Sequence, residues 1–234
     1  GETRAKVIFL AGCVMRITDP SALDATLRVL SINGVDIKIP KNQGCCVAIT
    51  SHGGEHKIAQ DMARRNIDSF LSEPCDAIVV SSAGCGSTMK EYGDLLKDDP
   101  QYFDKAKRIA ELTKDVHEFL FDLGLKQPDN QLNYTVTYQD PCHLLNAQKI
   151  SKAPRYLLDQ IPGLNRIEMA ENNICCGSAG VYSITQPEMS QMLTQKKVNL
   201  IFEENPPDLE SQVKKINNKY LQQDHGIEVL NLAG

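Results

Sequence analysis

The sequence predicts an α/β fold made of two similar Rossmann-like repeats, each with a parallel sheet and with cysteine loops at the carboxyl ends of its strands. Each repeat has a single cysteine followed, after nearly the same interval, by a Cys-Cys pair. The two sets are Cys13 with Cys45-Cys46, and Cys142 with Cys175-Cys176. β-rich runs end just before both single cysteines, and segments of strand and helix character alternate, as in a doubly wound parallel sheet.

The first repeat opens with a strand at 6–10, "KVIFL", which ends just before Cys13. The segment 21–34, "SALDATLRVLSING", predicts a helix closed by Gly34. A second strand at 35–39, "VDIKI", then leads to "PKNQGCC".

An amphipathic helix is expected after the first Cys-Cys pair, because apolar residues recur there at spacings of three and four. These residues are Ile58, Ala59, Met62, Ala63, Ile67, Phe70 and Leu71. The run "DAIVV" at 76–80 predicts a buried strand that leads to Cys85. Residues 86–133 are mostly charged and helical in pattern, so we expect helices that lead to a linker.

The second repeat preserves this order. A strand at 134–138, "YTVTY", precedes Cys142; a helical segment, "APRYLLDQIPG", and a strand at 164–169 then lead to "AENNICC". We therefore assign residues 1–128 to the first repeat with its helical extension and 129–234 to the second.

Composition narrows the class of protein. The 234 residues are 41% hydrophobic and 24% charged, and the net charge of -5 argues against nucleic acid as a partner. No segment has the roughly 20 apolar residues of a transmembrane helix, so no transmembrane segment is expected. No secretory signal is recognised at the start, which indicates the cytoplasm. Because the first residue is glycine, the chain is interpreted as a processed or excised piece of a longer one.

Eight cysteines in a reducing compartment indicate metal or redox chemistry and not disulfides. In a doubly wound sheet the loops after the strands gather at one edge, where ligands bind. Four thiols of the first repeat follow such strands and are candidates for one site: Cys13, Cys45, Cys46 and Cys85. Cys75, at the start of a strand, fits a small buried hydrophobic residue instead.

Four thiolates suit an iron–sulfur cluster or a structural zinc ion. Zinc sites usually pair cysteines two to four residues apart, and no such pair occurs, which favours the cluster. A catalytic Cys142 with His143 as its base is a third interpretation, although neighbours in sequence seldom meet in that geometry. His52 and His56 are either ligands or, the simpler interpretation, loop and cap residues. Glycines beside the thiols allow backbone N–H groups to approach a cofactor; those named as cofactor-binding are Gly44, Gly84 and Gly177.

Several dispersed motifs resemble the cysteine-rich CCG-domain family, which includes the iron–sulfur subunit of glycolate oxidase, lactate-utilisation proteins and the cysteine-rich subunit of heterodisulfide reductase. They are "GCVM", "QGCC", "SHGG", "AGCGSTMKEYG", "DPCHL", "QKI", "PR", "CCGSAGVY" and "QPEMS". The resemblance runs through nearly the whole chain and is nearest to the C-terminal part of the glycolate oxidase subunit.

The resemblance implies an electron-transfer module of a flavin-dependent 2-hydroxy-acid dehydrogenase, not catalytic alone. It implies a [4Fe-4S] cluster on the four thiols of the first repeat. It also implies a second cluster site, complete or incomplete, on Cys142, Cys175 and Cys176. The implied partners are a FAD-containing dehydrogenase subunit and a ferredoxin-like iron–sulfur domain or subunit. The implied location is the cytoplasm, or the periphery of the inner face of the membrane.

This chain departs from the family pattern at three places. Val47 replaces the glycine that follows the first pair, and Ser82 stands where heterodisulfide reductase relatives have another cysteine. Between Glu210 and Ser211 the sequence lacks the "NPGC"-like loop with the fourth thiol of the second repeat. Three explanations stay open: these residues were lost, a loop is absent from the sequence as given, or the second site has degenerated. A ferredoxin-type C-x-x-C-x-x-C run is also missing, which suggests an excised domain or a subunit with a separate ferredoxin-like partner.

Two rival functions stay open. The first is a heterodisulfide-reductase-like enzyme that cleaves disulfides at a cluster. The second is a scaffold domain that kept the fold with zinc or without metal. Metal content separates this scaffold from the other two functions.

Overall fold

The computed structural model describes residues 2–178 and 180–203, and within them it divides into two compact units. The first contains residues 2–126 and 143–154, and the second contains 127–142 and 155–203. A short segment after Cys142 thus belongs to the first unit. The boundary between 128 and 129 stays a prediction for the repeats.

The first unit is built on a parallel four-stranded sheet in the order β2-β1-β3-β4. The strands are β1 (Ala5–Leu10), β2 (Val35–Lys38), β3 (Ala77–Val80) and β4 (Thr113–Asp115). Apolar, buried side chains make up all of β3 and all of β1 except the exposed Lys6, as expected for strands covered on both faces. The predicted strands at 6–10, 35–39 and 76–80 are confirmed to within one residue at either end. The short β4 was missed, because "TKD" has no β-rich run.

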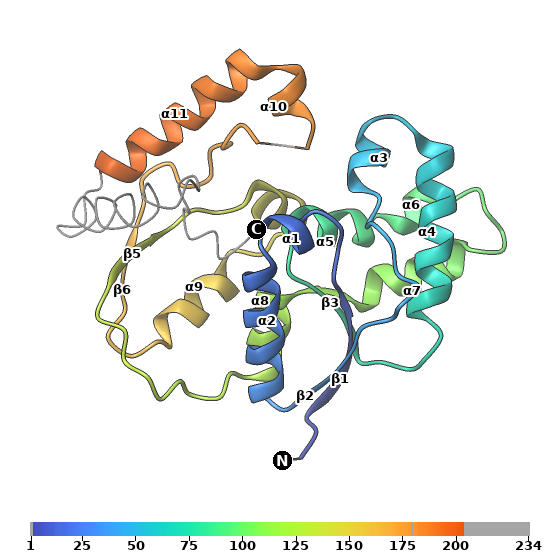
Figure 1. Cartoon of the computed structure of the whole chain (residues 1–234), viewed down its shortest axis with the longest axis horizontal. Helices are drawn as coiled ribbons and strands as arrows, with labels where there is room; N and C mark the ends of the chain where they lie inside the picture. The colour runs from blue at the N-terminus through green and yellow to red at the C-terminus, as the bar shows by residue number, and fades with distance from the viewer. Residues whose placement is uncertain (1, 179, 204–234) are drawn as a thin grey trace. The chain divides into compact units, whose positions relative to one another are not determined.

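Helices cover both faces of this sheet. Figure 1 shows α2 (Pro20–Ile32) and α8 (Val116–Leu123) on one side, and α4 (His56–Phe70) and α7 (Phe103–Leu112) on the other. Asp19 caps α2 by accepting the N–H of Ala22, and Gly34, at φ +82°, follows its end. The shorter helices are α1 (Met15–Thr18), α3 (Ala48–His52), α5 (Ala83–Lys90) and α6 (Tyr92–Leu95).

The main core lies between the sheet and the α4–α7 layer. Ala59, Ala63, Ile67 and Phe70 of α4 are fully buried there, which confirms the predicted stripe. Ile58 is 52% exposed, so its place in the stripe was wrong. It lies one position away from Ala59 on the helix, about 100° around the axis, and this rotates its side chain to solvent.

The second unit has a two-stranded parallel sheet of β5 (Thr135–Tyr138) and β6 (Asn165–Glu168). The helix α9 (Lys152–Asp159) lies between these strands in the chain. After β6 come α10 (Tyr182–Thr185) and the long α11 (Pro187–Glu203). A short π-helix, His143–Ala147, joins the first unit, where Leu144 packs with Ala83. Both units are α/β with parallel strands, as predicted.

Candidate metal centre

The carboxyl ends of β1, β2 and β3 carry the four cysteines of the first unit. Cys13 follows β1, Cys45 and Cys46 lie on the loop after β2, and Cys85 lies in the first turn of α5, after β3. Because β1 lies between β2 and β3, all three loops meet at one edge of the sheet, at its topological switch point. The structure therefore brings together four thiols that are distant in sequence.

The four thiols contact one another in pairs. The Sγ atoms of Cys13 and Cys45 are 3.4 Å apart. Cys46 interacts with both Cys45 and Cys85. Within the described ranges, no three His, Cys, Asp or Glu side chains are spaced as ligands of one metal ion. The donor set itself, four thiols from three loops, is the one that iron–sulfur clusters use.

These contacts shift the thiol pKa values in opposite directions. The hydrogen bond from Cys46 lowers the pKa of Cys45 to about 5, and a second one lowers the pKa of Cys85. The same bonds raise the pKa of Cys46, and burial raises that of Cys13. As the pH rises, Cys45 and Cys85 therefore become thiolates before Cys13 and Cys46 do. Thiolates are the metal-binding form of cysteine.

Two buried side chains fix the backbone of the first pair. Asn66 of α4 accepts the N–H of Gly44 at 2.8 Å and donates to the carbonyl oxygen of Cys45 at 2.7 Å. The hydroxyl of Tyr92 accepts from Asn66 and donates to the carbonyl oxygen of Cys46 at 3.2 Å. Sequence reasoning missed both residues, although a polar Asn66 inside an apolar helical stripe was a usable signal.

Other predicted residues of this unit have different surroundings. Val47 takes a left-handed backbone, φ 72°, at the position where the family has glycine. The N–H of Gly44 points to Asn66, and Gly84 lies in the first turn of α5. The Nδ1 atom of His143 lies 3.1 Å from Ser87 Oγ, and His52 ends α3. Cys75 is partly buried against the main core, which fits its predicted packing role.

In the second unit, the two strands end before the remaining cysteines. Cys142 follows β5, and Cys175 and Cys176 lie on the loop after β6. The N–H of Gly177 approaches the Sγ of Cys175 at 3.3 Å, and the Sγ of Cys176 lies 3.1 Å from Ser178 Oγ. The position between Glu210 and Ser211, where the fourth thiol was expected, lies outside the described residues.

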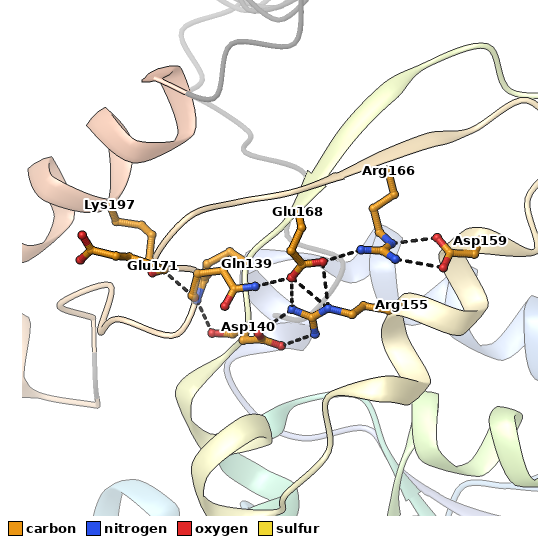
Figure 2. A network of polar contacts seen from close by, with 9 residues as sticks. Gln139, Asp140, Arg155, Asp159, Arg166, Glu168, Glu171 and Lys197 are labelled. Carbon is orange, nitrogen blue, oxygen red and sulfur yellow. Dashed lines mark hydrogen bonds and ion pairs between the residues drawn. The ribbon is translucent and has the colours of Figure 1, made fainter.

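An ion-pair network joins the ends of these two strands (Figure 2). Arg155 of α9 binds both oxygens of Asp140, at 2.8 and 2.7 Å, and its Nε lies 3.0 Å from Glu168. Asp140 precedes Cys142 by two residues and is 3% exposed. Arg155 lowers the pKa of Glu168, and Arg166 ties Glu168 to Asp159. Arg155 lies in the motif "PR", but no spacing in the sequence indicated its pairing with Asp140.

The cysteine loops of both units lie in segments that match one family of known proteins. The family model described as "Cysteine-rich domain", CCG, matches residues 7–90 and 136–211. The chain belongs to the CCG cysteine-rich domain family. The two matched segments contain all seven cysteines named as ligands. The predicted resemblance is confirmed.

The chain is similar to several named proteins of this kind. It is 38% identical to the probable glycolate oxidase iron-sulfur subunit of Bacillus subtilis, over 85% of this chain and 45% of the relative. It is 34% identical to a subunit of the fumarate reductase (CoM/CoB) of Methanothermobacter marburgensis, over 84% of this chain and 38% of the relative. It is 30% identical to lactate utilization protein A of Shouchella clausii, over 81% of this chain and 79% of the relative. The chain therefore spans less than half of the first two relatives.

These relatives support an iron–sulfur cofactor and an electron-transfer role for the chain. Among the described residues, no helix is both long and apolar enough to cross a membrane.

Proposed function

We propose that this chain is the iron–sulfur electron-transfer module of a flavin-dependent 2-hydroxy-acid dehydrogenase of the glycolate type. In the first unit, Cys13, Cys45, Cys46 and Cys85 would hold one [4Fe-4S] cluster. The observation that carries this proposal is the direct contact of these four thiols at the switch point of one sheet. A bound cluster would supply one-electron chemistry, which the amino acids of the chain do not.

The residues of the chain would then bind and orient this cofactor. Asn66 and Tyr92 fix the carbonyl groups of the Cys-Cys pair, so the two thiols leave the loop in a set direction. Cys45 and Cys85, with their lowered pKa values, would bind iron first and release few protons. Gly84 remains a proposed cofactor-binding position, and Gly44 contributes through its contact with Asn66.

The second unit would hold a second cluster through Cys142, Cys175 and Cys176, with Gly177 donating its N–H to sulfur. Such hydrogen bonds tune cluster potentials. If no fourth thiolate joins these three, one iron has no cysteine ligand, and this site would be the more labile of the two. Arg155 supports it by holding the Cys142 loop to the end of β6.

The partners in this proposal are a FAD-containing subunit, which oxidises the 2-hydroxy acid, and a ferredoxin-like iron–sulfur domain or subunit, which passes electrons on. The similarity to a glycolate oxidase iron-sulfur subunit supports this. The compartment we propose is the cytoplasm, with a peripheral place at the inner face of the membrane as the alternative. Eight free thiols support a reducing compartment.

The experiment is anaerobic purification followed by iron, sulfide and zinc analysis with an absorption spectrum. Cys85→Ser should remove most of the first cluster's signal, while the matched control Cys75→Ser should leave it nearly unchanged. Equal losses in both variants would refute the ligand assignment. Zinc without sulfide would favour the scaffold alternative.

A disulfide-cleaving enzyme is the second candidate, because the cysteine motifs of the chain resemble those of the cysteine-rich subunit of heterodisulfide reductase. Against it, Ser82 replaces the additional cysteine of that branch, and here it hydrogen-bonds to Cys85. Reduction of a mixed thiol disulfide by the chain alone would favour this candidate. Turnover of glycolate or lactate without an added flavoprotein would contradict the electron-transfer proposal.

A further inference from the structure

One face of α11 holds the loop that carries the second Cys-Cys pair. Ser190 donates to the carbonyl oxygen of Gly177 at 2.8 Å, and Thr194 donates to that of Cys176 at 2.9 Å. One turn further on, Lys197 Nζ donates to the carbonyl oxygen of Asn172 at 2.8 Å. Positions four and three apart share one face of a helix. Three side chains of α11 are thus directed at this single loop.

Helix and loop approach each other too closely for a side chain at Gly177. Its φ is +85°, and a Cβ atom there would lie 2.5 Å from the carbonyl oxygen of Ser190. The close approach also directs the N–H of Gly177 to Cys175 Sγ. The contact between α11 and the cysteine loop is therefore tight, and Lys197 is held within it.

Lys197 is the unusual member of this face, because it is a lysine with only 4% of its surface exposed. Its Nζ atom contacts the neutral carbonyl oxygens of Asn172 and Glu171. Among the described residues, no carboxylate forms an ion pair with it, since the Glu171 carboxylate pairs with the exposed Lys196. A buried charge is costly unless an opposite charge compensates it.

Burial lowers the pKa of Lys197, and the acidic groups that oppose this effect most strongly are Cys176, then Asp140 and Cys175. Asp140 already forms a bidentate pair with Arg155. The thiol pair is therefore the place where an uncompensated negative charge would balance Lys197. The first unit differs: there the helix that contacts the loop of the first pair is α4, and it does so through the neutral Asn66.

We propose that Lys197 is the buried counter-charge of the second cysteine site and raises the reduction potential of an iron–sulfur cluster bound at Cys175 and Cys176. This inference rests on the proposed function. When one electron arrives from the reduced flavin of the partner, the site gains one negative charge and no bond breaks. The positive charge of protonated Lys197 would stabilise that negative charge. Asn66 brings no charge, so the second site accepts an electron more readily than the first.

The test uses the full chain with Cys85→Ser, so that the second site supplies the remaining cluster signal. Lys197→Gln removes the charge and keeps a hydrogen-bond donor, and Lys197→Arg keeps the charge. Lys196→Gln is the matched control, because Lys196 is the exposed neighbour on the same helix. Each chain is reconstituted with iron and sulfide and titrated with dithionite while the reduced cluster is followed by electron paramagnetic resonance.

At a fixed potential, Lys197→Gln should lower the ratio of reduced to oxidised cluster about tenfold, a shift of about 59 mV for one electron. Lys197→Arg and Lys196→Gln should match the parent chain. An unchanged ratio in Lys197→Gln would overturn this inference alone. If Lys197→Gln binds no cluster but Lys197→Arg still does, the result supports a role for the positive charge. Loss of the cluster in both variants overturns the inference. A parent chain without a second-site cluster would refute the proposed site and this inference with it.

Discussion

Asn66 should stabilise both the first unit and its metal centre, because it makes three hydrogen bonds around the Cys-Cys pair. In Asn66→Ala, the N–H of Gly44 and the carbonyl group of Cys45 lose this partner, and Tyr92 keeps only its bond to Cys46. Asn66 itself is 1% exposed, so water replaces it poorly.

The magnitude follows from these two backbone groups. A buried group without its hydrogen-bond partner costs about 1–3 kcal/mol. Gly44 is exposed and Cys45 is partly buried, so the sum for Asn66→Ala is toward the lower end for two such groups, about 2–4 kcal/mol. Gln60→Ala on the same helix is the matched control, because Gln60 makes one bond, to the carbonyl oxygen of Leu95. Its cost should be about 1 kcal/mol.

The assay is urea unfolding of the metal-free chain, followed by iron content after reconstitution. Asn66→Ala should lower the free energy of unfolding by clearly more than Gln60→Ala and should also lower the iron bound at the first site. Asn66→Asp keeps the acceptor for Gly44 and loses both donated bonds, so it should also bind less iron. Equal stability and equal iron content in Asn66→Ala and Gln60→Ala would show that the loop does not depend on Asn66.

Two further predictions concern Gly177 and Cys45. Gly177→Ala should destabilise the contact between α11 and the cysteine loop by about 2–3 kcal/mol, because the added Cβ would meet a backbone oxygen at 2.5 Å. Gly180→Ala, also at positive φ but with no atom within 4 Å, should cost less in the same unfolding measurement; equal costs would contradict the close approach. In the metal-free chain, Cys45 should react with iodoacetamide with a midpoint near its pKa of about 5, well before Cys46, as followed by peptide mass spectrometry. Reaction of Cys45 only near pH 9 would refute the lowered pKa. Because the pKa of Cys45 is lower in the folded state than its ordinary value of 9.0, the thiolate stabilises the fold fully above pH 9.0, and this stabilisation is lost as the pH falls toward about 5.

The strands and helices of the first unit follow from local patterns in the sequence. Alternation and apolar runs depend on neighbouring residues, and therefore the strands around Ile8 and Val79 and the buried face of α4 could be predicted. The meeting of Cys13, Cys45 and Cys85 was also predictable, because parallel strands place their following loops at one edge. Exposed Ile58 shows the limit of such patterns: helical spacing alone does not fix the edge of the buried stripe.

Only the tertiary structure shows what surrounds the cysteines. Asn66 contacts Cys45, Arg155 contacts Asp140, and Lys197 lies buried beside the second pair. These contacts join segments that no shared period or motif relates, and their energies depend on burial and on distances of about 3 Å. The sequence by itself determined which thiols could gather and on which strands they lie. The packing of helices onto those loops decided which polar side chains contact the cysteine loops. It also decided whether such a side chain is neutral, as Asn66 is, or charged, as Lys197 is.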